Sequence, residues 1–109
     1  MEWPDGVVEL TEEKLDDFVN RYPVVVVDFW GPACAPCKMI APIMDDLSRS
    51  MKGKVAFAKM DVTQNLKLAA RMSIRSIPTI VFYKNGQVAK QKVGFLAKNK
   101  FSTEINEIL

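Results

Sequence analysis

The chain has 109 residues, 49% of them hydrophobic, and a formal net charge of +2. This length and composition predict one domain over residues 1–109 with a sizeable core, and they exclude a disordered tail or linker. Lysine and arginine form no tight cluster with interleaved aromatic residues, and the longest apolar stretch is far too short to span a bilayer, so neither nucleic acid nor a membrane is expected as a partner.

Charge is divided unevenly along the chain. Residues 1–54 contain six Lys or Arg and ten Asp or Glu, whereas residues 55–109 contain nine and three. This division predicts a dipolar surface. No basic, apolar leader segment precedes the first expected strand, which favours a cytoplasmic protein.

The first half of the chain predicts two strands and two helices. A short strand is expected over residues 7–10, and Thr11 is expected to cap a helix that ends before Pro23. Residues 24–30 are mostly β-branched and apolar without alternation, which predicts a strand buried on both faces at the centre of a sheet. A second helix is expected from Cys34 to Gly53.

The second half predicts a strand over residues 55–60, a short helix over 65–72 and a strand over 79–84. The Asn-Gly pair that follows is typical of a hairpin turn, so residues 87–93 should return antiparallel. Apolar residues at helical spacing near the end predict a closing helix. Strands interleaved with helices and then a hairpin predict an α/β fold with a mixed sheet.

Cys34 and Cys37 are the only cysteines, and they lie where the buried strand ends and the second helix begins. A disulfide between them closes so short a loop that the chain-entropy estimate is about 2 kcal/mol, which makes a purely stabilising role a poor explanation. A helix N-terminus favours a thiolate over a thiol, so Cys34 is the expected nucleophile. The spacing also places both sulfur atoms on one helix face, within bonding reach.

Other interpretations stay open both for the two cysteines and for Asp28 in the preceding strand. A structural metal site would need ligands from a second chain, because there is no histidine and no third cysteine. Asp28 stands alone in the valine-rich strand, where burial would raise its pKa. Alternatively, Asp28 reaches solvent at the end of the strand.

The segment 27–42 reads Val-Asp-Phe-Trp-Gly-Pro-Ala-Cys-Ala-Pro-Cys-Lys-Met-Ile-Ala-Pro and resembles the active-site segment of the thioredoxin family. Ser-Ile-Pro-Thr at 76–79 and Lys-Asn-Gly at 84–86 also match that family at the right separation. The resemblance extends from about residue 7 to 109. It implies the thioredoxin fold, with a central mixed five-stranded sheet flanked by four helices, and a protein dithiol–disulfide oxidoreductase.

The resemblance also assigns roles to particular residues. It implies that Asp28, helped by Lys59, moves a proton to or from Cys37 while Cys37 attacks the mixed disulfide on Cys34. Composition alone predicts a trans bond before Pro78, whereas the family implies a cis bond that brings this backbone against the sulfur atoms. The Ile77 backbone would then pair with an extended substrate segment.

A rim of substrate-contacting residues is likewise implied by the resemblance, and it comprises Trp30, Pro32, Ala33, Ile77, Gly94 and Phe95. Three alanines depart from the family pattern. Ala33 replaces a common Trp before the first cysteine, Ala35 replaces the Gly after it, and Ala97 replaces a capping Ser of the last helix. Ala33 would open the site and Ala35 would stiffen it, so the family's targets and redox potential do not carry over to this chain.

The resemblance implies a monomer without a cofactor that reduces proteins containing disulfides. A separate thioredoxin reductase or an equivalent donor is expected, because the chain lacks a nucleotide-binding glycine fingerprint. Two alternatives were weighed: a glutaredoxin-like or isomerase-like thiol exchange protein, and a non-catalytic binding module with the thioredoxin fold.

Overall fold

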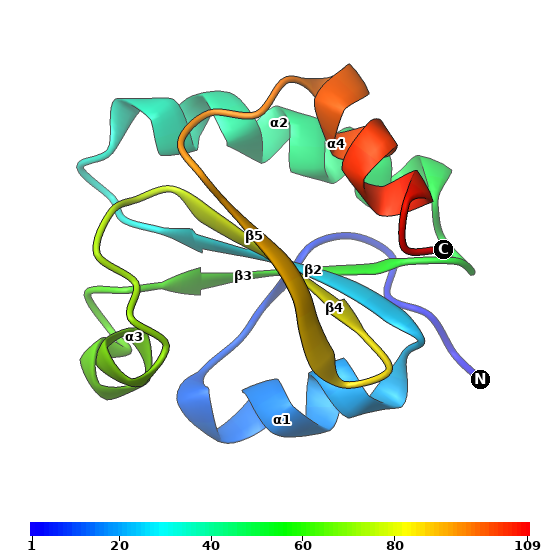
Figure 1. The fold of residues 1–109 in the computed structure, drawn as a ribbon, viewed down its shortest axis with the longest axis horizontal. Coiled ribbons are helices and arrows are strands. Elements are labelled where there is room, and N and C mark those ends of the chain that lie inside the picture. The colour runs from blue at the N-terminus through cyan, green and yellow to red at the C-terminus, as the bar shows by residue number, and fades with distance from the viewer.

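A five-stranded sheet separates two pairs of helices in the computed structural model, which describes residues 1–109 (Figure 1). Helices α1 and α3 cover one face of the sheet, and α2 and α4 cover the other (Figure 1). The elements in chain order are β1 (Val8–Glu9), α1 (Glu12–Arg21), β2 (Val24–Trp30), α2 (Ala35–Ser50), β3 (Ala56–Asp61), α3 (Leu66–Arg71), β4 (Thr79–Lys84), β5 (Gln87–Val93) and α4 (Lys98–Asn106).

The strands lie in the order β1-β3-β2-β4-β5. The first three strands are parallel, whereas β4 runs antiparallel to both β2 and β5. This arrangement confirms the predicted mixed sheet, the central position of β2 and the hairpin between β4 and β5. Because β2 and β3 are parallel, their carboxyl ends meet at one end of the molecule, where helix α2 also begins (Figure 1).

Alternate residues of β2 build two separate cores. Val25 and Val27 are fully buried against α1 and α3, whereas Val26 is fully buried against α2 and α4. Successive side chains of a strand point to opposite faces, so a strand buried on both sides needs apolar residues at every position. Asp28 is the one charged residue in this strand, and its position places it on the α2 face.

The start of α1 differs from the sequence prediction. Thr11 occupies the N-cap position but its side chain makes no capping hydrogen bond. The backbone N–H of Glu12 donates instead to Asn65 Oδ1 (3.1 Å), and the Glu12 carboxylate accepts from the backbone N–H of Leu68 (3.3 Å). Residues more than fifty positions apart thus cap the starts of α1 and α3 reciprocally.

The edge strand β5 is tied to α4 by a charged cluster that the sequence analysis did not foresee. Glu104 is buried, and its carboxylate contacts Lys90 at 2.9 Å and Lys100 at 3.0 Å. These two hydrogen-bonded lysines lower the pKa of Glu104 to about 2. Lys90 also anchors the last helix by contacting Glu107 at 2.6 Å.

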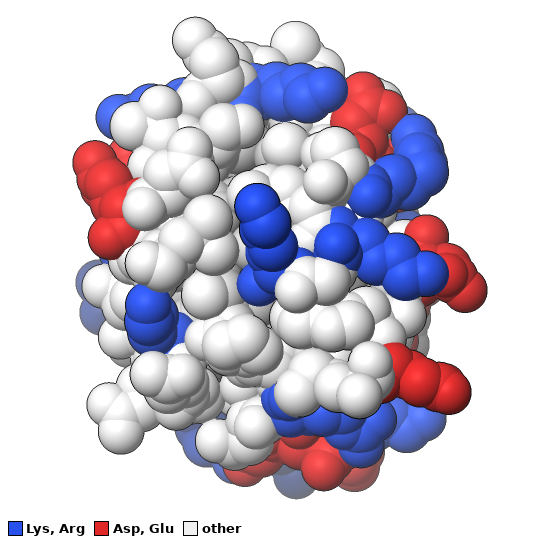
Figure 2. All heavy atoms as spheres, turned by 90° about the vertical axis from the view of Figure 1, so that its right-hand side faces the viewer, with Lys and Arg blue, Asp and Glu red and all other residues white.

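Figure 2 views the end of the molecule opposite the start of α2, the right-hand side of Figure 1. Its basic side chains are separated by uncharged groups and are interspersed with acidic ones, so this face carries no continuous basic patch. None of the helices is both long enough and apolar enough to cross a membrane.

Replacing Asn65 with Ala is expected to destabilise the protein by about 1–3 kcal/mol, because the start of α1 loses its acceptor and the Asn65 amide no longer bonds the Asp61 carbonyl. Urea unfolding measures the change. Asn99→Ala is the control, since Asn99 is exposed on α4 and its side chain makes no hydrogen bond; its effect should stay within about 0.5 kcal/mol. Equal effects of the two substitutions would contradict the reciprocal caps.

Candidate active site

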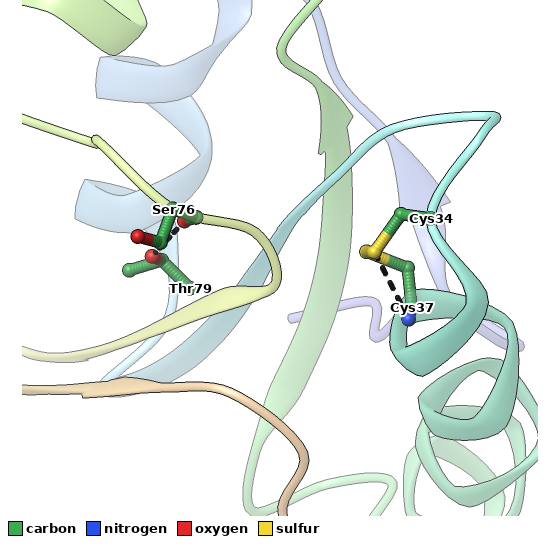
Figure 3. The surroundings of a disulfide bond; sticks show 4 residues. All are labelled: Cys34, Cys37, Ser76 and Thr79. Atoms are coloured by element: carbon green, nitrogen blue, oxygen red, sulfur yellow. Dashed lines mark hydrogen bonds between the residues drawn. A yellow bond between two sulfur atoms is a disulfide. The ribbon is translucent and has the colours of Figure 1, made fainter.

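The two cysteines lie at the first turn of α2, at the end of the sheet where β2 stops. Cys34 is the N-cap residue, and its Sγ accepts a hydrogen bond from the Cys37 backbone N–H at 3.2 Å. The two residues are joined by a disulfide, with their Cα atoms 5.3 Å apart (Figure 3). Pro36 occupies the first turn, where a missing N–H is not needed. The predicted placement of the pair at a helix N-terminus is therefore confirmed.

Cys34 is less exposed than the sequence analysis expects for a nucleophile at a helix end. Only 7% of its surface is exposed, against 4% for Cys37. Cys34 is less exposed than expected because the cap hydrogen bond and the disulfide both turn its Sγ atom toward the helix. The residues on either side, Ala33 and Ala35, are exposed, so a partner reaches Cys34 past two small side chains.

Asp28 lies behind the cysteines in a setting that disfavours its charge. The residue is 4% exposed, and no protein group comes within hydrogen-bond distance of its Oδ1 atom. Burial raises the pKa of Asp28 to about 7, and the positive charge of Lys59 partly opposes this rise. The structure therefore contradicts the alternative in which this carboxylate reaches solvent.

A cavity of about 150 Å³ connects Asp28 with Cys37. Ala41, Met44 and Asp45 line it from α2, together with Lys59 from β3. The sequence analysis missed these α2 residues, although their spacing from Cys37 by four, seven and eight positions marks one helix face. The cavity gives Asp28 and Cys37 a shared space in which a proton can pass between them.

Lys59 lies beside both Asp28 and Trp30. Its Cα atom is the register partner of Asp28 on the neighbouring strand, yet the two side chains form no ion pair within 4.0 Å. The Lys59 ammonium instead lies over the Trp30 ring, 5.4 Å from the ring centroid, as in a cation–π contact. Lys59 therefore acts on Asp28 through its field rather than through a direct bond.

The loop before β4 bends toward the disulfide (Figure 3). The Ile77–Pro78 peptide bond is cis, as the family resemblance implies and in contrast to the expectation from composition. Thr79 Oγ1 donates to the Ser76 carbonyl at 2.6 Å across this bend. The Gly94 N–H donates to the Pro78 carbonyl at 2.8 Å, which brings the end of β5 to the same loop.

The Ile77 side chain packs against the glycine that follows β2. A Cβ atom on Gly31 would lie only 2.8 Å from Cδ1 of Ile77. Glycine at this position therefore lets the chain before the cysteines pass directly beside the cis-proline loop.

The expected rim residues differ in exposure. Pro32, Ala33 and Phe95 are exposed, whereas Trp30, Ile77 and Gly94 are half-buried. Met39, on the second turn of α2, is 59% exposed.

The two cysteines form a disulfide at the start of α2. No three cysteine or carboxylate side chains come together in a way that could hold a metal ion. A disulfide at a helix N-terminus, next to a buried carboxyl group and a cis-proline loop, can instead be opened and closed by thiol exchange. This fold and site define a protein dithiol–disulfide oxidoreductase.

Comparisons with known proteins identify the family of this oxidoreductase. The thioredoxin family model matches residues 6–107, so the chain belongs to the thioredoxin family. Thioredoxin of Haemophilus influenzae is 45% identical over 89 residues, covering 82% of this chain and 83% of the relative. Thioredoxin of Rickettsia felis is 45% identical over 83 residues, covering 76% and 79%.

A solved structure of a thioredoxin mutant from Halobacterium salinarum superposes with a TM-score of 0.92 at 28% identity, covering 99% of this chain and 95% of that one. The thioredoxin fold expected from the sequence is thus confirmed. The comparisons also support the oxidoreductase over the glutaredoxin-like and binding-module alternatives.

The buried Asp28 makes the stability of the oxidised protein depend on pH. Its folded pKa of about 7 lies above the unfolded value of about 3.9, so the folded state binds more protons between these values. Stability should therefore fall as pH rises from about 4 to about 7. Asp28→Asn removes this loss and should be more stable than the parent by up to about 4 kcal/mol above pH 8.

Urea unfolding of both oxidised proteins at pH 5 and pH 8.5 measures this effect. Asp45→Asn, an exposed carboxylate beside the same cavity, controls for the change in net charge. A stability difference between Asp28→Asn and the parent that is equal at the two pH values would show that Asp28 is charged in the folded protein throughout.

Proposed function

We propose that this chain is a thioredoxin-type electron carrier that passes two electrons to disulfides of cytoplasmic proteins. The observation that carries the proposal is the Cys34–Cys37 disulfide at the start of α2, with a cavity leading from Cys37 to the buried Asp28. In this proposal residues 1–109 act as one domain and as a monomer. A separate reductase, such as a thioredoxin reductase, returns the electrons.

The reduced protein starts the reaction with Cys34 as thiolate. Cys34 attacks one sulfur of the substrate disulfide, a Cys34–substrate disulfide forms, and the other substrate sulfur leaves as a thiolate that takes a proton from solvent. The backbone N–H groups at the α2 N-terminus stabilise the Cys34 thiolate, because they carry partial positive charge. The first turn of α2 has no acidic side chain that would compete with the thiolate for these groups.

The second step depends on Cys37 and Asp28. The Asp28 carboxylate accepts the Cys37 proton through the shared cavity, and the resulting thiolate attacks Cys34. The Cys34–Cys37 disulfide forms, and the substrate leaves with its second sulfur reduced. A carboxyl group with a pKa of about 7 suits this role, since it can both take and return a proton near neutral pH.

The remaining residues hold the substrate in this scheme. The cis Ile77–Pro78 bend presents backbone N–H and C=O groups of Ile77 to an extended segment of the partner. Trp30, Pro32, Ala33, Gly94 and Phe95 supply apolar contacts around it. Lys59 keeps a positive charge near Asp28 and rests against the Trp30 ring.

Cys37→Ser should accumulate the mixed disulfide between Cys34 and a substrate, because no second thiol resolves it. The measurement is the yield of covalent adduct with a disulfide-containing protein, read by mass spectrometry before and after a small thiol reductant. The matched variant Cys34→Ser should give no adduct and no turnover. Adduct formation through Cys37 in that variant would contradict the assignment of Cys34 as nucleophile.

Asp28→Asn should slow release of the mixed disulfide by about 100-fold near pH 7, while its formation changes little. Stopped-flow kinetics with a fluorescent disulfide substrate separates the two steps. Asp45→Asn, whose carboxylate also borders the cavity, should leave both steps close to those of the parent. An unchanged release rate in Asp28→Asn would remove Asp28 from proton transfer.

A further inference from the structure

Three cations with no acidic partner lie on α3 and in the loop that leads from α3 to the cis-proline bond. Lys67 and Arg71 belong to α3, and Arg75 lies in the loop between α3 and β4. All three are exposed, and none takes part in any of the ion pairs of the structure. We refer to Lys67, Arg71 and Arg75 together as the basic surface.

The positive charges of the basic surface destabilise helix α3. Lys67 and Arg71 are four residues apart on one helix, where like charges face each other and oppose helix formation. Helix α3 contains no acidic residue to compensate them. Other helices of the same chain do pair their charges within a turn, as Arg21 with Asp17 and Arg49 with Asp46.

Two carboxylates near the start of α3 make hydrogen bonds to other groups. Asp61, at the end of β3, accepts hydrogen bonds from the Thr63 N–H at 2.8 Å and from the Thr63 hydroxyl at 2.6 Å. Glu12 accepts from the Leu68 N–H at the start of α3. Both acids are half-buried, whereas the basic surface is exposed and available to a partner.

The fold places the basic surface at the same end of the molecule as the disulfide. Helix α3 follows the carboxyl end of β3, beside the end of β2 that leads to the cysteines (Figure 1). Arg75 precedes by two residues Ile77, whose side chain lies against Gly31. Leu66, next to Lys67, is 69% exposed and adds an apolar contact on this side.

We propose that the basic surface docks an acidic segment of the partner protein and so selects among disulfide substrates. This inference rests on the proposed function and assigns it a substrate class: proteins with Asp or Glu residues close in sequence to the reducible cysteine. A partner segment that pairs in extended form with the Ile77 backbone would pass Arg75. Every second side chain of that segment would point to the same side. Complementary charge raises the rate of encounter and suppresses basic partners.

Two synthetic disulfide peptides of equal length test the proposal, one flanked by Glu and one by Gln. The reduced full chain should reduce the acidic peptide about 10-fold faster than the neutral peptide at low ionic strength, and this ratio should fall toward 1 in about 1 M salt. In Lys67→Gln/Arg71→Gln/Arg75→Gln the ratio should approach 1 at low ionic strength as well. The single variant Lys67→Gln should lower it partly.

Lys54→Gln is the matched control, because Lys54 is also exposed and unpaired but lies between α2 and β3, at the end of the sheet opposite the disulfide. It should keep the ratio of the parent. Equal rates for the two peptides with the parent protein, or an undiminished ratio in the triple and single variants, would overturn the proposal. If neither peptide is reduced, the proposed function itself fails, which is a distinct result.

Discussion

The hydrogen bond from the Cys37 backbone N–H to Cys34 Sγ fixes the sulfur of Cys34 at the start of helix α2. It exists because β2 stops at Trp30 and α2 starts with Cys34 as its cap, so a sulfur occupies the place usually taken by a serine or aspartate oxygen. The same N–H groups that a helix leaves unpaired at its start then stabilise negative charge on that sulfur.

Strand β2 gives the second cysteine a different environment. Its apolar residues bury both faces of the central strand, and they also deprive Asp28 of water, which raises its pKa to about 7. The cavity is lined by this carboxyl group and by Cys37, but not by Cys34, Ala33 or Ala35. In the proposed mechanism, backbone dipoles therefore act on the Cys34 sulfur, and a buried acid acts on the Cys37 sulfur. This division of environments explains how two cysteines three residues apart can have different roles.

Much of this could be predicted from the sequence, because the signals are local. The unbroken apolar run of β2, the Asn-Gly turn and the position of Cys34 and Cys37 at a strand–helix junction each follow from residues next to one another. The cis bond before Pro78 required the family resemblance, since composition favours trans. The reciprocal caps of Glu12 and Asn65, and the pairing of Glu104 with Lys90, depend on residues distant in sequence, and no local pattern marks such partners. Only the contact of Glu104 with Lys100 follows a local spacing, since the two lie four residues apart on α4.

If the start of α2 makes Cys34 the reactive sulfur while Cys37 is held back beside Asp28, timed alkylation of the fully reduced protein will distinguish the two cysteines. Iodoacetamide is added at neutral pH, samples are quenched at intervals, and peptide mass spectrometry reports the modified fraction at each cysteine. Cys34 should be modified well before Cys37. Equal rates at the two cysteines, or faster modification of Cys37, would contradict it.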